Sequence, residues 1–407
     1  MTSTDIAGAP CAGQPGSPGA ARVIVTGSVI TVAFMGSVIV TPLYSVFQTK
    51  FGFSDITLTL IYAVYVVGNV AALLLFGQIS DQVGRKRVSL PALGLAAASA
   101  LMFLFAQGTL WLYVGRLLIG LAVGILSGTG TAWLAEHFGA ERQSDATIAA
   151  ATANLSGIAI GPALGGLLAE YVAGPLVVPF LVYLAVLMLV AIAIAGTPEP
   201  GSGHIRRLAD VRVHPRLGVP RDRLRSFAAP AVTGFVTFAL GGLYFALIPR
   251  IVIRDLHVNN LAVGGLIVFE LGAVATACIV LGRRIPPAVA MISGLGSLLP
   301  AVALVVTAQA ARSMPLLLIA TAFAGVTMAL GYRGSLEVVN QIAPHDRRAE
   351  VVSSYYIACF VGNSVPVIGL GVLTTLSDPL IASVTFASTI AALALGAIGW
   401  HRRLSAR

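Results

Sequence analysis

The chain has 407 residues, of which 57% are apolar and only 10% are charged, and its formal net charge is +9. A soluble domain carries about a quarter charged residues, so most of this protein's surface must face lipid rather than water. The cations lie in the gaps between apolar stretches and not on one face of a polar domain, which argues against nucleic-acid binding.

The N-terminal segment 1–21 is rich in Gly, Ala, Pro and Ser. We expect a disordered tail without a cleavable signal peptide, because the segment has no apolar region of its own. The three cysteines, Cys11, Cys278 and Cys359, have the spacing of neither a disulfide framework nor a metal site.

Twelve later stretches are long and apolar enough to cross a bilayer as helices, which takes about 20 residues. They are 23–47, 56–76, 88–106, 110–136, 146–171, 176–195, 228–250, 260–281, 286–308, 314–335, 349–376 and 379–400. An all-α multi-pass membrane protein is therefore predicted, and the even number of spans places both termini on one side.

The charged residues indicate which side that is. With the N-terminus inside, the predicted cytoplasmic segments hold 19 Lys and Arg residues and the outer segments hold four. Positive charge concentrates on the cytoplasmic side of membrane proteins, so we expect both termini in the cytoplasm. The small, Ala-, Gly- and Arg-rich chain favours a bacterial inner membrane.

The stretch GQISDQVGRKR, residues 77 to 87, follows the second span. A glycine at the end of a span allows close helix packing, a second glycine allows a tight turn, and a carboxylate at the lipid boundary seeks an arginine or a helix N-terminus. The stretch resembles the G-x-x-x-D-x-x-G-R-[RK]-[RK] signature of the major facilitator superfamily of transporters. The matching residues are Gly77, Asp81, Gly84, Arg85, Lys86 and Arg87.

This resemblance covers nearly the whole chain beyond the tail. It implies 12 transmembrane helices in two pseudo-symmetric six-helix bundles, 22–195 and 228–400, followed by a short tail, 401–407. The cytoplasmic loop 196–227 between the bundles carries seven arginines and reads as a solvated linker, with a regulatory or lipid-binding role as the alternative.

A weak internal repeat at an offset of 205 residues agrees with two related halves. ERQSD at 141–145 matches DRRAE at 346–350, and glycines pair at the same offset. The glycine pairs are Gly120 with Gly325, Gly157 with Gly362 and Gly166 with Gly371.

In the family, the signature residues form a latch that closes the inner gate when the pore is open outward. The resemblance implies that Asp81 then faces the start of the eleventh helix near Val351, and that Arg85 pairs with Glu136 at the end of the fourth. The implied latch residues are Gly77, Asp81, Gly84, Arg85, Arg87 and Glu136; the alternative is that the cations only fix topology. Pro286 stands where the repeat would place a second Asp81, so no symmetric latch is expected.

The fifth span contains GIAIGPALGG, which resembles the antiporter motif of the family and is associated with exporters. Its residues are Gly157, Gly161, Pro162, Gly165 and Gly166. The glycines make a flat face and the proline kinks the helix, so the motif could seal the two halves together when the site faces the periplasm. A generic glycine-rich packing face is the alternative.

Two ionisable residues lie well inside predicted spans. Arg116 in RLLIGLAVG resembles the fourth-helix arginine that the family uses in proton coupling, and Glu270 lies near the middle of the eighth span. Apolar surroundings disfavour a charged carboxylate, so Glu270 could carry a proton or hold a cationic substrate. The alternatives are an arginine held by backbone carbonyls and a protonated, hydrogen-bonded glutamate. Span one contains no acid, although many drug-exporting relatives have one there.

Helical spacing on the spans that line the family's cavity gives a set of candidate substrate contacts. They are Ser37, Thr41, Tyr44, Tyr62, Tyr65, Asn69, Asn154, Phe238, Phe245, Tyr356, Phe360 and Asn363. This aromatic set with few hydrogen-bonding groups suits amphiphilic solutes better than sugars.

The sequence thus favours a monomeric, proton-coupled exporter of small amphiphilic compounds that works by alternating access. The alternative is a uniporter or proton symporter of a polar metabolite; a membrane sensor is a third reading. An enzyme is not expected, because the chain has no nucleophile–base set, nucleotide loop or metal spacing, and therefore no cofactor is expected either.

Overall fold

The computed structural model describes residues 19–76, 79–139, 142–197, 218–344 and 347–405. All regular structure in these ranges is helical, and 12 helices in them are long and apolar enough to cross a membrane. The predicted all-α, 12-span fold is confirmed.

The first half contains α1 (Ala20–Val38), η1 (Thr41–Leu43), α2 (Tyr44–Phe51), α3 (Asp55–Phe76), α4 (Ile79–Val83), α5 (Arg85–Leu104), α6 (Thr109–Phe138), α7 (Gln143–Tyr171) and α8 (Val178–Ala195). The second half contains α9 (Leu224–Ala246), α10 (Ile248–Arg254), α11 (Leu261–Leu281), η4 (Gly282–Arg284), α12 (Pro287–Ala310), α13 (Met314–Val326), η5 (Thr327–Gly331), α14 (Tyr332–Ile342), α15 (Arg348–Leu376) and α16 (Pro379–Ser405).

Several spans are not single α-helices. The first is α1, a 3₁₀ turn and α2 in succession, and the tenth is α13 and α14 joined by a π-helical turn, Thr327–Gly331. The seventh ends at Ala246, four residues before its predicted end, and α10 follows as a separate short helix. Pro249 in the first turn of α10 has no N–H to continue the hydrogen bonding of α9.

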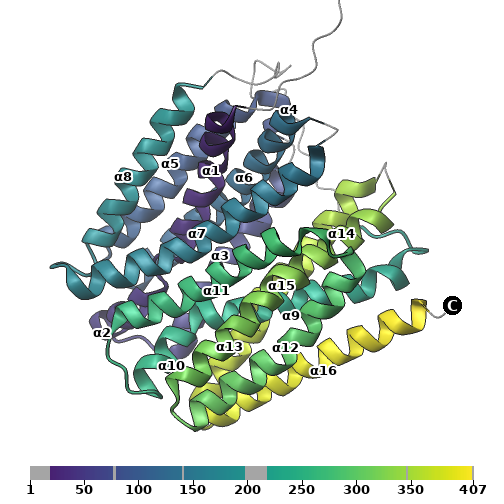
Figure 1. Ribbon diagram of the computed structural model, residues 1–407. Helices are drawn as coiled ribbons and strands as arrows, with labels where there is room; N and C mark the ends of the chain where they lie inside the picture. Colours follow the sequence, from purple (N-terminus) through teal and green to yellow (C-terminus); the bar gives the residue numbers. More distant parts are fainter. Residues whose placement is uncertain (1–18, 77–78, 140–141, 198–217, 345–346, 406–407) are drawn as a thin grey trace, which may run out of the picture.

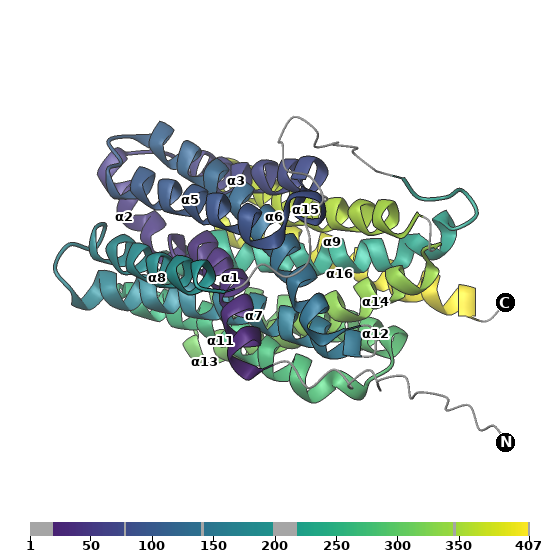
Figure 2. The ribbon, with the colours of Figure 1, turned by 90° about the horizontal axis from the view of Figure 1, so that it is seen from above.

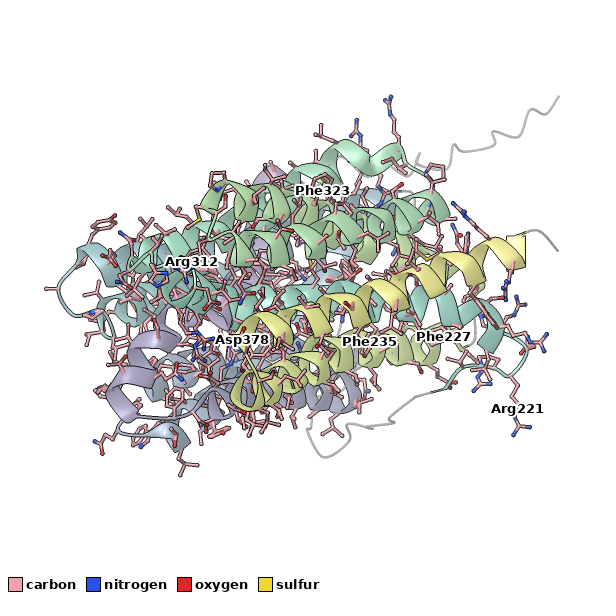
Figure 3. All side chains as sticks on the ribbon, turned by 90° about the horizontal axis from the view of Figure 1, so that it is seen from below. Arg221, Phe227, Phe235, Arg312, Phe323 and Asp378 are labelled. Atoms are coloured by element: carbon pink, nitrogen blue, oxygen red, sulfur yellow. The ribbon has the colours of Figure 1, made fainter. Side chains whose placement is uncertain are left out.

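Side-chain chemistry along the helices fits a membrane. Large apolar side chains such as Val67, Met188 and Ile192 are each more than 60% exposed on the outside of the bundle. Figure 3 shows Arg221 at one end of the molecule, with Arg312 and Asp378 toward the other and the labelled phenylalanines along the helices between them. Apolar residues can face outward in this way only where lipid replaces water.

The two halves pack internally in the same manner. In the first half α1 contacts α6, α7 and α8, and in the second half α9 contacts α14, α15 and α16. Between the halves the most extensive contacts are those of α7 with α11 and of α3 with α15 (Figures 1 and 2).

The repeat is visible in local structure as well. Arg142 pairs with Asp145 at the start of α7 at 2.8 Å, and Arg347 pairs with Glu350 at the start of α15 at 2.7 Å. The first residues of the two matched pentapeptides, 141 and 346, lie outside the described residues. The same turn therefore begins the fifth span of each half, as expected for pseudo-symmetric bundles.

Two ends of the molecule can be defined from this topology. We call "terminal end" the end where α1 begins and α16 finishes; it also carries α4 and the turns α6–α7 and α14–α15. We call "far end" the opposite end, which carries α2, α10 and the turns α7–α8 and α15–α16. In Figure 1 the halves lie close together at the far end, at lower left, and diverge toward the terminal end.

Candidate functional site

A cavity of about 1190 Å³ lies between the two halves and is lined by residues of both. At the terminal end its lining includes Gly139 and Gln143, which flank the α6–α7 turn, and Gln341 near the end of α14. No described residue of α2, of α10 or of the far-end turns lines it. The structure is therefore a conformation in which the cavity reaches the terminal end alone.

Most of the residues predicted to line the cavity do line it. They are Ser37, Tyr62, Tyr65, Asn69, Asn154, Phe238, Phe245, Tyr356, Phe360 and Asn363. The prediction was wrong for Thr41 and Tyr44, which are 3% exposed and are not among the residues that line the cavity. The 3₁₀ turn Thr41–Leu43 interrupts the helical spacing that would have placed them on the same face as Ser37.

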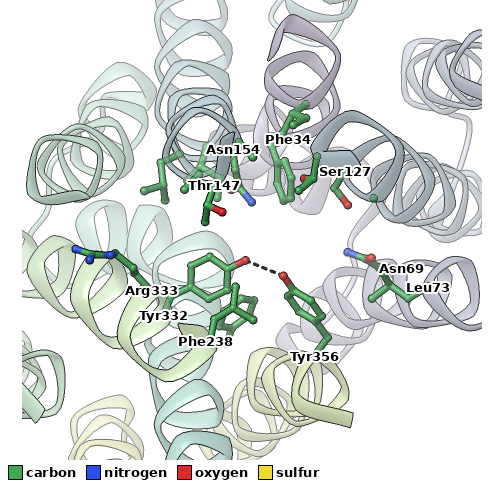
Figure 4. A pocket seen from close by; sticks show the side chains of 18 of the residues that line it. Phe34, Asn69, Leu73, Ser127, Thr147, Asn154, Phe238, Tyr332, Arg333 and Tyr356 are labelled. Carbon is green, nitrogen blue, oxygen red and sulfur yellow. Dashed lines mark hydrogen bonds between the residues drawn. The ribbon is translucent and has the colours of Figure 1, made fainter. Parts of the chain in front are cut away.

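The two walls of the cavity differ in chemistry (Figure 4). The first half contributes the amide and hydroxyl groups of Asn69, Ser127, Thr147 and Asn154, next to apolar side chains such as Phe34. The second half contributes a cluster of aromatic side chains, with Arg333 beside it. Phe238 makes edge contacts with Tyr332 and with Phe360, at centroid distances of 5.6 and 5.9 Å, and the Tyr332 and Tyr356 hydroxyls are 3.1 Å apart.

Several residues line the cavity without having been predicted from the sequence. Ser127, Thr147 and Tyr332 are examples. The seven-residue spacing of Thr147 and Asn154, two helical turns, was an available signal. Tyr332 had none, because the π-helical turn just before it changes which face of the tenth span meets the cavity.

Arg116 lines the closed end of the cavity, toward the far end of the molecule, and is 1% exposed. Its Nη1 donates to the Ser37 carbonyl at 2.5 Å, and its Nε is buried without a hydrogen-bond partner. The guanidinium carbon lies 4.9 Å from the Tyr65 ring centroid, 5.2 Å from that of Tyr62 and 6.0 Å from that of Tyr44. Three tyrosine rings thus surround a buried cation.

Two further arginines line the cavity nearer the terminal end, and both are ion-paired. Arg85 pairs with Glu136 at 2.7 Å, and Arg333 pairs with Glu337 at 2.9 Å. Arg333 also donates to backbone carbonyls of the α11–α12 turn, including that of Gly282 at 2.5 Å. Carbonyl groups therefore hold this arginine at a turn that lacks an equivalent of Asp81.

The signature stretch lies beside the terminal end of the cavity. Asp81 of α4 pairs with Arg85, the first residue of α5, and the Asp81 side chain is 57% exposed. Arg85 also donates to Ser80 at 2.6 Å, so its guanidinium is bound entirely within the first half. Gly84 has φ 116°, a conformation that requires glycine in the tight turn. Arg87 is exposed, and Gly77 lies outside the described residues.

The glycines of the fifth span serve two contacts. A Cβ at Gly157, Gly161 or Gly165 would overlap backbone atoms of α1, in the same half. A Cβ at Gly166 would come within 2.6 Å of the Leu261 carbonyl oxygen in α11, in the other half. The Pro162 carbonyl also faces α11, where Gly265 leaves room for it. The motif thus joins the halves in a conformation open at the terminal end.

Polar contacts accompany this closure at the far end. Asp55, 8% exposed at the start of α3, forms an ion pair with Arg250 of α10, and Gln48 donates to the same carboxylate at 2.9 Å. The Glu170 carboxylate accepts from the Leu261 backbone N–H at 2.8 Å, at the first residue of α11. Both acids belong to the first half and both partners to the second.

Glu270 is not among the residues that line the cavity. Its Oε2 is buried without a hydrogen-bond partner. The repeat offset relates Glu270 to Tyr65 and Thr321 to Arg116. The two intramembrane ionisable groups therefore occupy different positions of the repeat, Glu270 on the second span of its half and Arg116 on the fourth span of the other.

The chain resembles several curated proteins over about a third of its length. It is 32% identical to the vesicular acetylcholine transporter of Rattus norvegicus over 151 residues, which are 37% of the chain and 27% of that protein. It is 29% identical to the chloramphenicol resistance protein CraA of Acinetobacter baumannii over 34% of each chain. It is 27% identical to the bacillibactin exporter of Bacillus subtilis over 37% of the chain and 39% of that protein. The matches thus span about a quarter to two fifths of these relatives.

Solved structures show the same fold over nearly the whole chain. A bacterial homologue of the human lysosomal transporter Spinster matches in its inward-facing, unoccupied conformation with a TM-score of 0.67, 14% identity and coverage of 95% of both chains. In its inward-facing, occupied conformation the TM-score is 0.69 at 14% identity, over 92% of this chain and 96% of that one. The family description Major Facilitator Superfamily matches residues 26–367. The chain is a multi-pass membrane protein and belongs to the Major Facilitator Superfamily of transporters.

Proposed function

We propose that this transporter exports small amphiphilic compounds by alternating access, with protons as the coupling ion. The observation that carries the proposal is a cavity between the halves that reaches one end only and is lined by an aromatic cluster of the second half and by amide and hydroxyl groups of the first. An amphiphile can place its apolar part on the aromatic cluster and its polar part on the amides and hydroxyls opposite.

The proposed motion is a rocking of two bundles, 22–195 and 228–400, around the cavity, with 196–227 as the connection. The positive-inside rule makes the terminal end cytoplasmic, in a bacterial inner membrane, so the cavity takes up solute from inside the cell. Opening outward then requires the far-end contacts to break, including Asp55–Arg250. Asp81 would exchange its contact with Arg85 for the start of α15, near Val351.

Glu270 is the proposed proton carrier. It has no ion-pair partner among the described residues, whereas the acids that line the cavity are paired. A carboxyl group in this position can take up a proton without breaking an ion pair, and Arg116 is the second group we assign to coupling.

The amide and hydroxyl groups support a second candidate, a uniporter or proton symporter of a polar metabolite. Asn69, Asn154, Ser127 and Thr147 would bind such a solute. The aromatic cluster favours the amphiphile, since a polar solute would leave it without a partner.

Proton flux in proteoliposomes tests the proposal. A pH-sensitive dye reports proton movement while chloramphenicol, ethidium or 2-naphthoate is added to the unaltered protein, Glu270→Gln and Glu270→Asp. We expect at least one probe to move protons with the unaltered protein and with Glu270→Asp, which keeps the carboxyl group, but not with Glu270→Gln.

Two results would contradict parts of the proposal. Transport of a probe without proton movement would replace antiport with uniport. Proton-coupled transport that persists in Glu270→Gln would move the proton carrier to another residue.

A further inference from the structure

The charged groups that line the cavity do not balance. Among the described lining residues are three arginines, Arg85, Arg116 and Arg333, and two acids, Glu136 and Glu337. Each acid is paired with one arginine, at 2.7 Å for Arg85 and 2.9 Å for Arg333. Arg116 has no carboxylate partner in the part of the chain that the structure describes, and it is the most buried of the three.

The surroundings of Arg116 leave donors unused. Its Nε is buried without a partner, and the hydroxyl of Tyr44, whose ring lies 6.0 Å from the guanidinium carbon, is also buried without one. The Tyr65 hydroxyl accepts from Asn69, and the Tyr62 hydroxyl donates to Asn363, so these two hydroxyls are engaged elsewhere. Ring faces attract a cation but do not neutralise it, and an unpaired buried charge is destabilising.

The aromatic cluster begins close to this cation. Tyr62 packs against the guanidinium and donates to Asn363 at 3.0 Å, and Asn363 lies one turn of α15 from Phe360. Phe360 in turn contacts Phe238 and Tyr356. Only Tyr62 and Asn363 therefore stand between the Arg116 guanidinium and the aromatic cluster that begins at Phe360. A small molecule can contact both the cation and the cluster.

We propose that the cavity selects amphiphiles that carry a single negative charge, such as aromatic carboxylates, and that Arg116 binds the anionic group. The inference rests on the proposed function and names its substrate class. A cationic amphiphile would meet an uncompensated like charge, and a neutral one would leave Arg116 unpaired. An anionic one completes the third arginine–carboxylate pair of the cavity with a charge-assisted hydrogen bond.

A binding experiment with matched probes tests the inference. The full chain in nanodiscs is titrated by calorimetry with 2-naphthoate and with 2-naphthamide, which has a closely similar shape but no charge. We expect the acid to bind at least tenfold more tightly than the amide, which corresponds to about 1.4 kcal/mol. In Arg116→Gln the acid should lose this advantage while the amide binds as before, and Arg283→Gln, an exposed cation away from the cavity, should keep it.

Three results would overturn the inference. Equal binding of acid and amide by the unaltered protein removes the charge preference, and this comparison stands even where Arg116→Gln fails to fold. A preference that survives in folded Arg116→Gln places the anion elsewhere. If chloride raises the unfolding temperature as much as 2-naphthoate does, Arg116 binds inorganic anions only.

The proteoliposome assay separates this inference from the proposed function. If chloramphenicol is transported with protons and the acid has no preference, the proposed function stands and the substrate class is wrong. If 2-naphthoate binds through Arg116 but none of the probes crosses the membrane, the anion site stands and the exporter is wrong.

Discussion

Asp55 makes one of the polar contacts that join the two halves at the far end. It is 8% exposed, pairs with Arg250 of the other half and accepts from Gln48 at 2.9 Å. Opening the far end must break the contact with Arg250, whereas the bond with Gln48 lies within the first half. The Asp55–Arg250 pair therefore stabilises one conformation relative to the other and acts on their equilibrium rather than on folding alone.

We predict that Asp55→Asn shifts the protein toward outward opening. Losing a charge-assisted bond costs about 1.5–3 kcal/mol, and about 1.4 kcal/mol changes an equilibrium tenfold. Thr59→Cys, in a background without the native cysteines, reports this opening. Thr59 of α3 is 0% exposed because it packs against Gly371 of α15. Labelling of the introduced cysteine by a water-soluble maleimide should become at least tenfold faster in Asp55→Asn.

Asp378→Asn is the matched control. This acid also lies at the far end, but it accepts a hydrogen bond from the Leu380 N–H within its own half. Its loss should leave the labelling of Thr59→Cys unchanged. Equal acceleration by both variants would mean that far-end charge in general, and not the contact between halves, controls access.

Single contacts within one half could be predicted from the sequence, and contacts between halves could not. The signature and the order of the spans suggested Arg85 with Glu136, and the structure contains this ion pair at 2.7 Å. Asp55 and Arg250 lie in different halves, and no local pattern shows which cation an acid will meet across an interface.

At the scale of elements, α7 and α11 approach each other so closely that their backbones are in contact. Gly265 receives the Pro162 carbonyl and lies against Gly166, so a side chain on α11 here would push the two halves apart. By contrast, Gly157 fits against the Thr31 carbonyl of α1, in its own half. The same kind of residue thus supports a movable contact in one place and a fixed one in the other.

We predict different effects for alanine at these two glycines. Gly265→Ala should accelerate labelling of Thr59→Cys, because overpacking by about 1–3 kcal/mol is relieved when the halves separate at the far end. Gly157→Ala should instead lower the unfolding temperature without accelerating labelling. Gly369→Ala, where an added Cβ meets nothing within 4 Å, serves as the neutral control. Acceleration by Gly157→Ala as large as that by Gly265→Ala would contradict this division.

Each span could be predicted from the length and apolar character of its sequence, because a bilayer requires both. The irregular turns did not follow, because their causes are tertiary or local to a proline. In the tenth span the π-helical turn ends at Gly331, whose position is set by close approach to Thr237 and Gly294. In the first span the turn at Thr41–Leu43 moved two predicted cavity residues out of the lining.

At the scale of the whole molecule, the sequence indicated two related halves but not which end of the cavity is open. In the proposed alternating-access motion the same residues must support both conformations, so no motif can favour one of them strongly. In this structure the far end is closed and the cavity reaches the terminal end. The test of a two-body mechanism is therefore to hold the far end closed and measure what is lost.

A disulfide across the far-end interface provides that test. A Cβ on Gly371 of α15 would lie 3.1 Å from the Cβ of Thr59 on α3, slightly less than the 3.5–4.5 Å usual for a disulfide. We predict that oxidised Thr59→Cys/Gly371→Cys binds substrate from the terminal end with unchanged affinity but transports none, and that reduction restores transport. Only the movement between halves is blocked, because the cavity lining contains neither residue.

The single variant Thr59→Cys, treated with the same oxidant, should transport throughout, which excludes damage by the oxidant itself. Undiminished transport by the fully cross-linked protein would mean that solute crosses without separation of α3 from α15 at this point. A local gate would then replace the rocking of two rigid bundles. The Asp55–Arg250 ion pair would be the first candidate for that gate, because it joins the halves at the far end through α10 rather than through α15.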